Sequence, residues 1–150
     1  MTAEWDAFIE ALATCLADLP SRATLIITAS GNRYVQFQQF DIKLSAELTG
    51  NYYLAQPISD SAAQRLRDLG WTAPALHREI ENWRRTLTWP LPPDALPDLA
   101  RSAALGLHEA LGIDTPGELS AKGWTDHRRP LSLGALSTVT HRDPARHTLN

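Results

Sequence analysis

The chain contains a stretch that reads Ala23-Thr24-Leu25-Ile26-Ile27-Thr28-Ala29, then Ser30-Gly31-Asn32, then Arg33-Tyr34-Val35-Gln36-Phe37-Gln38-Gln39-Phe40, then Asp41-Ile42-Lys43-Leu44-Ser45-Ala46-Glu47-Leu48. The last run alternates between polar side chains and four apolar ones, which are Ile42, Leu44, Ala46 and Leu48. This alternation is the period of a half-buried strand. Ser30-Gly31-Asn32 predicts a turn, because Gly and Asn tolerate positive φ. The stretch therefore predicts a meander of three or four antiparallel strands with one solvent-exposed face.

The run from Arg33 to Phe40 has two chemically different faces. Val35 and Phe37 lie on one face, and we expect them to share a core with Ile42 and Leu44 against the first and third predicted helices. The other face holds Tyr34, Gln36, Gln38 and Phe40. Aromatic side chains on a polar face either lie under a loop or the C-terminal tail, or they line a ligand groove. The residues leave both alternatives open.

Three helices are predicted around these strands. Residues 3–18 have the apolar spacing of an amphipathic helix, with Thr2 as its N-cap. This apolar stripe either faces the core or serves partly as a dimer interface. A second helix begins at residues 59–61 and ends before Gly70, and a third, capped by Asp94, runs to Leu111 before Gly112. Thr115, Pro116 and Glu118 then predict a short helix with a capping box.

The segment before Pro90 is ambiguous. Residues 82–89 alternate as a strand does, which places Trp83, Arg85, Leu87 and Trp89 on one face. Alternatively, a helical turn covers residues 76–83 and only residues 85–89 are extended. The adjacent Arg84 and Arg85 bind an anion, stack on aromatic rings or belong to a solvated strand face.

Composition limits the class of protein. A chain of 150 residues with 43% hydrophobic content is long enough for one domain with a real core. Its net charge of −3 argues against a general nucleic-acid binder. Residues 121–150 hold five basic and two acidic residues, which leaves +3 there and −6 elsewhere. We expect a domain at residues 1–124 and a basic, mostly irregular tail at residues 125–150, loosely placed on the acidic body.

Cysteine usage and the first residues favour a cytoplasmic protein. Cys15 is the single cysteine, so an intrachain disulfide is excluded, and we expect an inert, half-buried thiol. The first six residues resemble no secretory signal, and no apolar run approaches the ~20 residues of a membrane span. A reducing compartment without membrane insertion is therefore expected.

The sequence shows no catalytic constellation. None of the five histidines has metal-ligand spacing with a Cys, a Glu or a second His. The glycines are scattered and form no phosphate-binding loop. Ser30 before Gly31 lacks the strand–turn–helix setting of a nucleophile elbow. We therefore expect no cofactor, no metal and no enzymatic activity.

The order of predicted elements and several short signatures resemble one family. The signatures are Asn32-Arg33-Tyr34-Val35-Gln36-Phe37, Ala46-Glu47, Gly50-Asn51-Tyr52-Tyr53-Leu54, Leu66, Leu69-Gly70-Trp71, Pro74, Asn82-Trp83, Pro90, Gly112-Ile113, Pro116 and Leu119. They resemble the type III secretion chaperone and YbjN-like peptide-binding chaperones, also called TY-Chap domains. The resemblance covers roughly residues 3–120 and leaves the tail out.

The resemblance implies an α+β fold, in which a twisted antiparallel sheet packs against helices in the order α-β-β-β-α-β-α, commonly as a homodimer. It also implies non-catalytic binding of an extended segment of a client protein, such as a secretion substrate. A structural or regulatory subunit of a larger assembly is the alternative, ahead of an enzyme or a nucleic-acid binder. From strand alternation we expect exposed or half-exposed aromatic residues to bind peptide, namely Tyr34, Phe40, Tyr52, Trp83 and Trp89.

Overall fold

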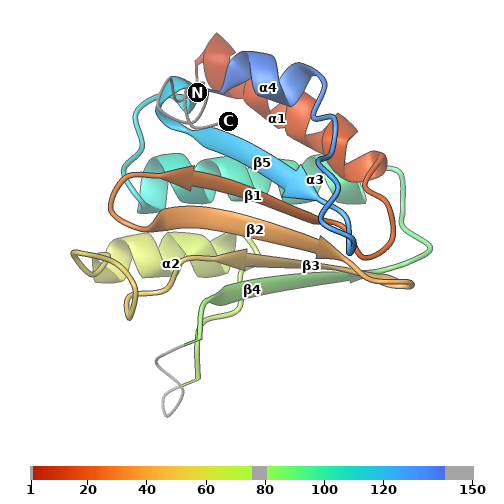
Figure 1. Ribbon diagram of the computed structural model, residues 1–150. Coiled ribbons are helices and arrows are strands. Elements are labelled where there is room, and N and C mark those ends of the chain that lie inside the picture. The colour runs from red at the N-terminus through yellow and green to blue at the C-terminus, as the bar shows by residue number, and fades with distance from the viewer. Residues whose placement is uncertain (1, 76–80, 141–150) are drawn as a thin grey trace.

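A computed structural model describes residues 2–75 and 81–140 (Figure 1). It contains α-helices, β-strands and two short helical turns of other types. In chain order they are α1 (Ala3–Ala17), β1 (Thr24–Ala29), β2 (Arg33–Gln39), β3 (Lys43–Leu48), α2 (Asp60–Asp68), β4 (Trp83–Thr88), α3 (Ala95–Leu105), the π-helical turn η1 (Gly106–Ala110), the 3-10 turn η2 (Pro116–Glu118), β5 (Ser120–Trp124) and α4 (Ala135–Val139). The α-β-β-β-α-β-α order expected from sequence is thus confirmed as far as α3.

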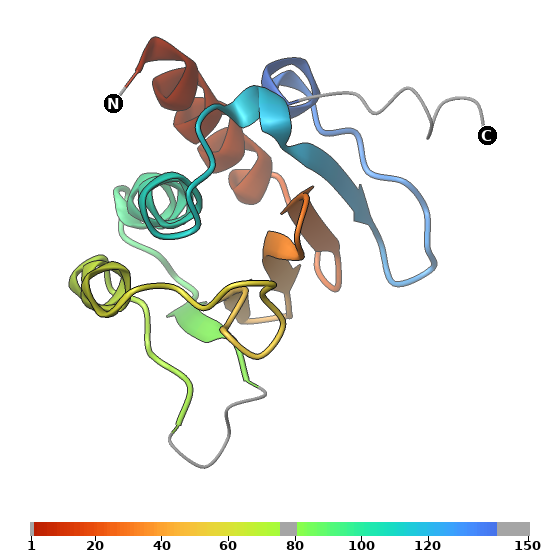
Figure 2. The ribbon, with the colours of Figure 1, turned by 90° about the vertical axis from the view of Figure 1, so that its left-hand side faces the viewer.

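The strands form a five-stranded antiparallel sheet in the order β4-β3-β2-β1-β5. The predicted meander supplies its centre, where Phe37 pairs with Leu25 on one side and with Ala46 on the other. Figure 2 shows α1, α2 and α3 on one side of the sheet, and no helix of residues 2–75 and 81–140 forms a layer on its other face. The fold is α+β, with a helical layer over one sheet face.

The core lies between the sheet and the helices. Val35, Phe37 and Leu44 are fully buried, which confirms the predicted facing of β2 and β3. Ile42 is an exception, because its side chain is 66% exposed. The prediction that Ile42 joins this core is wrong. It precedes Lys43, the first residue of β3, and therefore lies in the turn after β2 rather than in the regular strand.

Local signals fix most of the helix ends. The Thr2 side chain accepts a hydrogen bond from the backbone N–H of Trp5, as an N-cap does. Gly70 and Gly112 follow helical segments with φ of 96° and 73°, which L side chains rarely adopt. Asp94 differs from the prediction, since it precedes α3 without a side-chain capping bond.

From residue 120 onward, the structure differs from the prediction. Sequence reasoning did not predict β5, which pairs with β1 along Ser120–Trp124. Beyond it, Leu136 of α4 is fully buried, and α4 packs against α1 (Figure 1). The expectation of a loosely placed tail is therefore wrong for this part of the segment, because apolar side chains anchor it. These side chains are Leu131, Leu133, Leu136 and Val139. Residues 141–150, and residues 76–80 of the proposed helical turn, lie outside the described residues.

Candidate functional site

The outer edge of β4 presents backbone groups that the sheet does not use. The backbone N–H of Thr72 donates to the Arg84 carbonyl at 2.8 Å, and the N–H of Arg84 donates to the Thr72 carbonyl at 3.0 Å. The backbone groups of Arg84 therefore point away from β3. In an antiparallel ladder every second residue points the same way, so those of Thr86 and Thr88 also point outward. Within residues 2–75 and 81–140, no backbone partner for them is present outside the sheet ladder.

This free edge is short. At one end, the bridge to Thr72 occupies the outward groups of Arg84. At the other end, the N–H of Trp89 donates inward to the Ile42 carbonyl at 2.7 Å, and Pro90 has no N–H to offer. Thr86 and Thr88 remain, each with an exposed side chain and with one N–H and one C=O turned outward.

The opposite edge of the sheet is partly closed by the chain itself. The backbone N–H of Leu131 donates to the Gly123 carbonyl at 3.0 Å, and Trp124 forms an isolated bridge with Pro130. The segment after β5 therefore lies along part of its outer edge (Figure 1). Uncovered edges pair readily with other chains, and covering segments limit this pairing. Among the described residues, Thr72 alone pairs with the outer edge of β4 through its backbone.

Two of the predicted binding residues lie near the free edge. Phe40, in the turn after β2, is 41% exposed, and the Lys43 Nζ atom lies 5.4 Å from the centre of its ring. Trp89 directly follows Thr88 and is half-buried. Its Nε1 atom is buried without a hydrogen-bond partner in the described part of the chain. Both residues belong to the end of the sheet where β4 finishes.

The other three predicted residues belong to the opposite end of β4. Tyr34 is half-buried, and its hydroxyl accepts a hydrogen bond from Asn82 Nδ2 at 2.9 Å. Tyr52 is 63% exposed in the loop after β3, and its ring lies 5.0 Å from that of Tyr53. Trp83 is in the core with 5% exposure, so the expectation of an exposed or half-exposed side chain is wrong for it. The five residues do not form one surface.

The burial of Trp83 has a physical cause. It shares the helix-covered sheet face with Leu87, and the guanidinium carbon of Arg67 in α2 lies 5.6 Å from the centre of its ring. The strand alternation was correct, but the helices cover the face that the prediction left open. Sequence reasoning also missed Thr86 and Thr88, although their exposed positions follow from the same alternation.

Comparison with known proteins identifies the family. One family model matches residues 1–125, which is most of the chain, and it describes T3SS (YopN, CesT) and YbjN peptide-binding chaperones. The chain belongs to this family, TY-Chap3. The resemblance inferred from the sequence signatures and the α+β fold class are thereby confirmed. A search of curated proteins found no match, and a search of solved structures also found none.

The single thiol of this TY-Chap3 member, Cys15, is half-buried in α1. Burial, and then the negative charge of Asp18, raise the pKa of the Cys15 thiol, which lowers its reactivity. Among the described residues, no group of three or more His, Cys, Asp or Glu side chains is arranged to hold a metal ion. In the same part of the chain, no helix is long and apolar enough to cross a bilayer.

Proposed function

We propose that this TY-Chap3 protein holds an extended segment of a client protein, which adds as a short strand to the free edge of β4. The observation that supports this function is the outward backbone of Thr86 and Thr88, with the exposed ring of Phe40 at the same end of the sheet. Strand addition gives affinity through main-chain hydrogen bonds and makes little demand on sequence. It suits a family of peptide-binding chaperones. Because the family description names T3SS, a protein awaiting secretion is one class of client that we propose.

The register of the sheet predicts a pattern for the client. Client residues opposite Thr86 and Thr88 would point to the uncovered face, where Ser45 and Gln38 continue the row. A client residue opposite Leu87 would point to the helical side, where Leu87 itself is only half-buried. Successive strand residues alternate between the two faces. We therefore expect the bound client segment to have polar residues opposite Thr86 and Thr88 and an apolar residue opposite Leu87.

The test is a proline substitution that removes one outward N–H without breaking the ladder to β3. In Thr86→Pro, the lost N–H points away from β3, and proline is tolerated on edge strands in this orientation. Client-like peptides are first selected on an array of extended peptides. The affinity of a selected peptide is then measured by fluorescence anisotropy. We expect Thr86→Pro to weaken its binding about tenfold, from the lost hydrogen bond and the blocked approach.

Two control variants separate the loss of the Thr86 N–H from the loss of its side chain and from the general effect of a proline in an edge strand. Thr86→Ala removes the side chain but keeps the N–H, so it should bind nearly as the parent chain does. Ala121→Pro places the same residue on the opposite edge, where Ala121 points outward in register with Gly123. It should leave peptide binding unchanged. If Thr86→Pro folds and binds normally, the client does not add to β4.

Phe40 and Trp89 are the aromatic contacts that we propose for the added strand, because they lie where β4 ends. Phe40→Ala removes an exposed ring and should weaken peptide binding by several-fold. Tyr52→Ala removes a more exposed ring at the other end of the sheet, and it serves as the control. Equal losses in the two variants would place the aromatic contacts elsewhere.

We further propose a cytoplasmic homodimer. The helical stripes that suggested a dimer are buried inside one chain, since Trp5, Phe8 and Leu12 are fully covered. Support now comes from the adjacent exposed rings of Tyr52 and Tyr53, which two copies would bury together. Light scattering at micromolar concentration should give twice the 16.6 kDa mass of the chain. A monomer at that concentration contradicts the dimer and leaves the proposed peptide site intact.

A further inference from the structure

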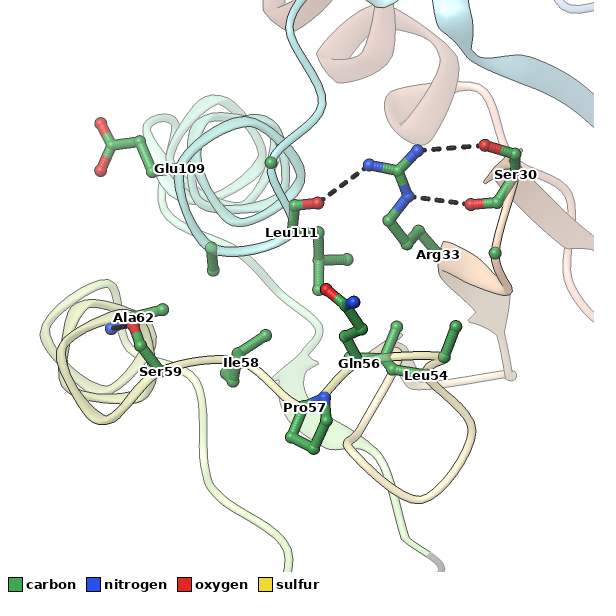
Figure 3. Close-up of a pocket in the computed structure, with 14 residues that line it drawn as sticks. Ser30, Arg33, Leu54, Gln56, Pro57, Ile58, Ser59, Ala62, Glu109 and Leu111 are labelled. Atoms are coloured by element: carbon green, nitrogen blue, oxygen red, sulfur yellow. Dashed lines mark hydrogen bonds between the residues drawn. The ribbon is translucent and has the colours of Figure 1, made fainter.

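A cleft of about 530 Å³ lies at the end of the sheet where β1 turns into β2 (Figure 3). Its walls come from the β1–β2 turn, the loop at residues 54–59, the first turn of α2 and the end of η1. About half of the lining surface is apolar, with contributions from Leu54, Pro57, Ile58, Ala62 and Ala110. Pockets with apolar walls and a few fixed polar groups are typical of ligand sites. The cleft is separate from the free edge, because Thr86 and Thr88 belong to the other end of β4.

Arg33 is the fixed polar group of this cleft. Its Nε–H donates to the Ser30 carbonyl at 2.8 Å, and Nη1 donates to the Leu111 carbonyl at 3.0 Å. Nη2 donates to the Ser30 hydroxyl at 3.2 Å. Figure 3 shows the guanidinium held between Ser30 and Leu111, across the cleft from Ser59 and Ala62. The side chain is therefore oriented before any ligand arrives, which lowers the entropy cost of binding.

The charge of Arg33 has no carboxylate partner in residues 2–75 and 81–140. Arg33 and Arg85 are the arginines of that region whose side chains are not exposed. Arg85 pairs with Asp98 at 3.1 Å, whereas all three acceptors of Arg33 are neutral oxygens. The carboxylate of Glu109, which also lines the cleft, is held by Arg65 at 2.6 Å. A guanidinium has five N–H donors, so two of those on Arg33 remain for a ligand.

We propose that this cleft binds a peptide carboxylate on Arg33, with the neighbouring apolar side chain of the peptide against Pro57 and Ile58. A carboxylate matches the planar guanidinium and forms charge-assisted hydrogen bonds with it. A single arginine supplies one positive charge, which suits a monoanion better than a phosphate dianion. The apolar walls favour the same choice, since a nucleotide would bring further polar groups. The site does not depend on strand addition at β4.

The experiment uses three labelled peptides with an apolar residue beside the anionic group. One ends in a free carboxylate, one is its C-terminal amide, and one is an amide with an internal Asp. Fluorescence anisotropy should show that the free acid binds at least about tenfold more tightly than the plain amide, as charge-assisted bonds do. Tight binding of the Asp peptide supports a side-chain carboxylate, and weak binding supports a C-terminal one. Equal affinity of acid and plain amide overturns the proposal, and so does tighter binding of inorganic phosphate.

Three substitutions test whether Arg33 is the residue that binds the peptide carboxylate. Arg33→Gln should remove the preference for the acid, but it also loses bonds to Ser30 and Leu111 and is informative only if circular dichroism shows the native fold. Gln56→Glu is the second variant, because Gln56 is exposed, lines the cleft and gains a carboxylate of the same shape. The new carboxylate should compete for Arg33 and weaken the binding of the free-acid peptide about tenfold. Ser61→Glu adds the same charge outside the cleft and should change nothing.

Two further outcomes are decisive. If the Gln56→Glu variant still prefers the free-acid peptide over the amide as strongly as the parent chain does, Arg33 is not the residue that binds the carboxylate. Thr86→Pro should bind the acid peptide normally, because its change lies at the other end of β4. This variant therefore distinguishes failure of the carboxylate site from failure of the proposed strand addition.

Discussion

Truncation of Phe37 tests the placement of the core. Phe37 is fully buried, lies on the helix-covered face of β2 and pairs with Leu25 and Ala46 in the adjacent strands. Phe37→Ala removes a buried ring and leaves a cavity between the sheet and the helices. Such truncations cost about 3–5 kcal/mol of folding free energy. Small domains have a total stability of roughly 5–15 kcal/mol, so the variant should be folded but markedly less stable.

Ile42→Ala is the matched control for this prediction. The alternation of the sequence assigns Ile42 and Phe37 to one core, but the structure exposes 66% of Ile42. A substitution at an exposed position without special contacts changes the stability by about 0.5 kcal/mol or less. The structure therefore predicts a large loss of stability for Phe37→Ala alone, whereas the simple alternation pattern predicts a substantial loss for both variants.

The assay is urea unfolding followed by circular dichroism, together with a thermal scan. A loss of 1 kcal/mol lowers the Tm by about 2–4 °C in a domain of this size. Phe37→Ala should therefore lower the Tm by roughly 6–20 °C, and Ile42→Ala by no more than about 2 °C. Equal shifts in the two variants would refute the assigned facing. A near-parental Tm for Phe37→Ala would refute the buried position of β2.

Two further predictions concern α4 and the thiol. Leu136→Ala should cost about 2–5 kcal/mol in urea unfolding, because Leu136 is fully buried, whereas a loosely placed tail predicts no loss. The pKa of the Cys15 thiol is raised, first by burial and then by Asp18, so its thiolate fraction at pH 8 is below that of the unfolded chain. Iodoacetamide should thus modify the native chain more slowly than the urea-unfolded chain, and Asp18→Asn should increase the native rate. Faster modification of the native chain would contradict the raised pKa.

Local sequence patterns predicted the centre of the fold but not its edges. The meander from β1 to β3 follows from alternation and one turn, because neighbouring strands are close in sequence. β5 has the sequence Ser120-Ala121-Lys122-Gly123-Trp124, which has little apolar alternation. It becomes a strand because it pairs with β1, almost a hundred residues earlier in the chain. Such a distant partner leaves no signal in the local pattern.

The candidate site was harder to predict than the fold. Alternation separates the two faces of a strand but does not state which face the helices cover. Trp83 was assigned to a binding surface for this reason, and it lies under α2 instead. The free backbone of Thr86 and Thr88 depends on where Thr72 pairs and on where Pro90 ends the strand. Both features depend on the tertiary structure, so the sequence positions of the aromatic residues indicated only part of the candidate site.

The length of the free edge limits how the proposed complex gains affinity. Thr86 and Thr88 each offer one N–H and one C=O, and a protein hydrogen bond contributes about 0.5–1.5 kcal/mol net. Even when all of these groups are paired, the sum falls short of the roughly 8 kcal/mol of a micromolar complex, and ordering the client costs more. Side-chain contacts must supply the remainder, which is why the exposed Phe40 and the half-buried Leu87 matter. A short edge also limits pairing with other copies, since long uncovered edges promote aggregation.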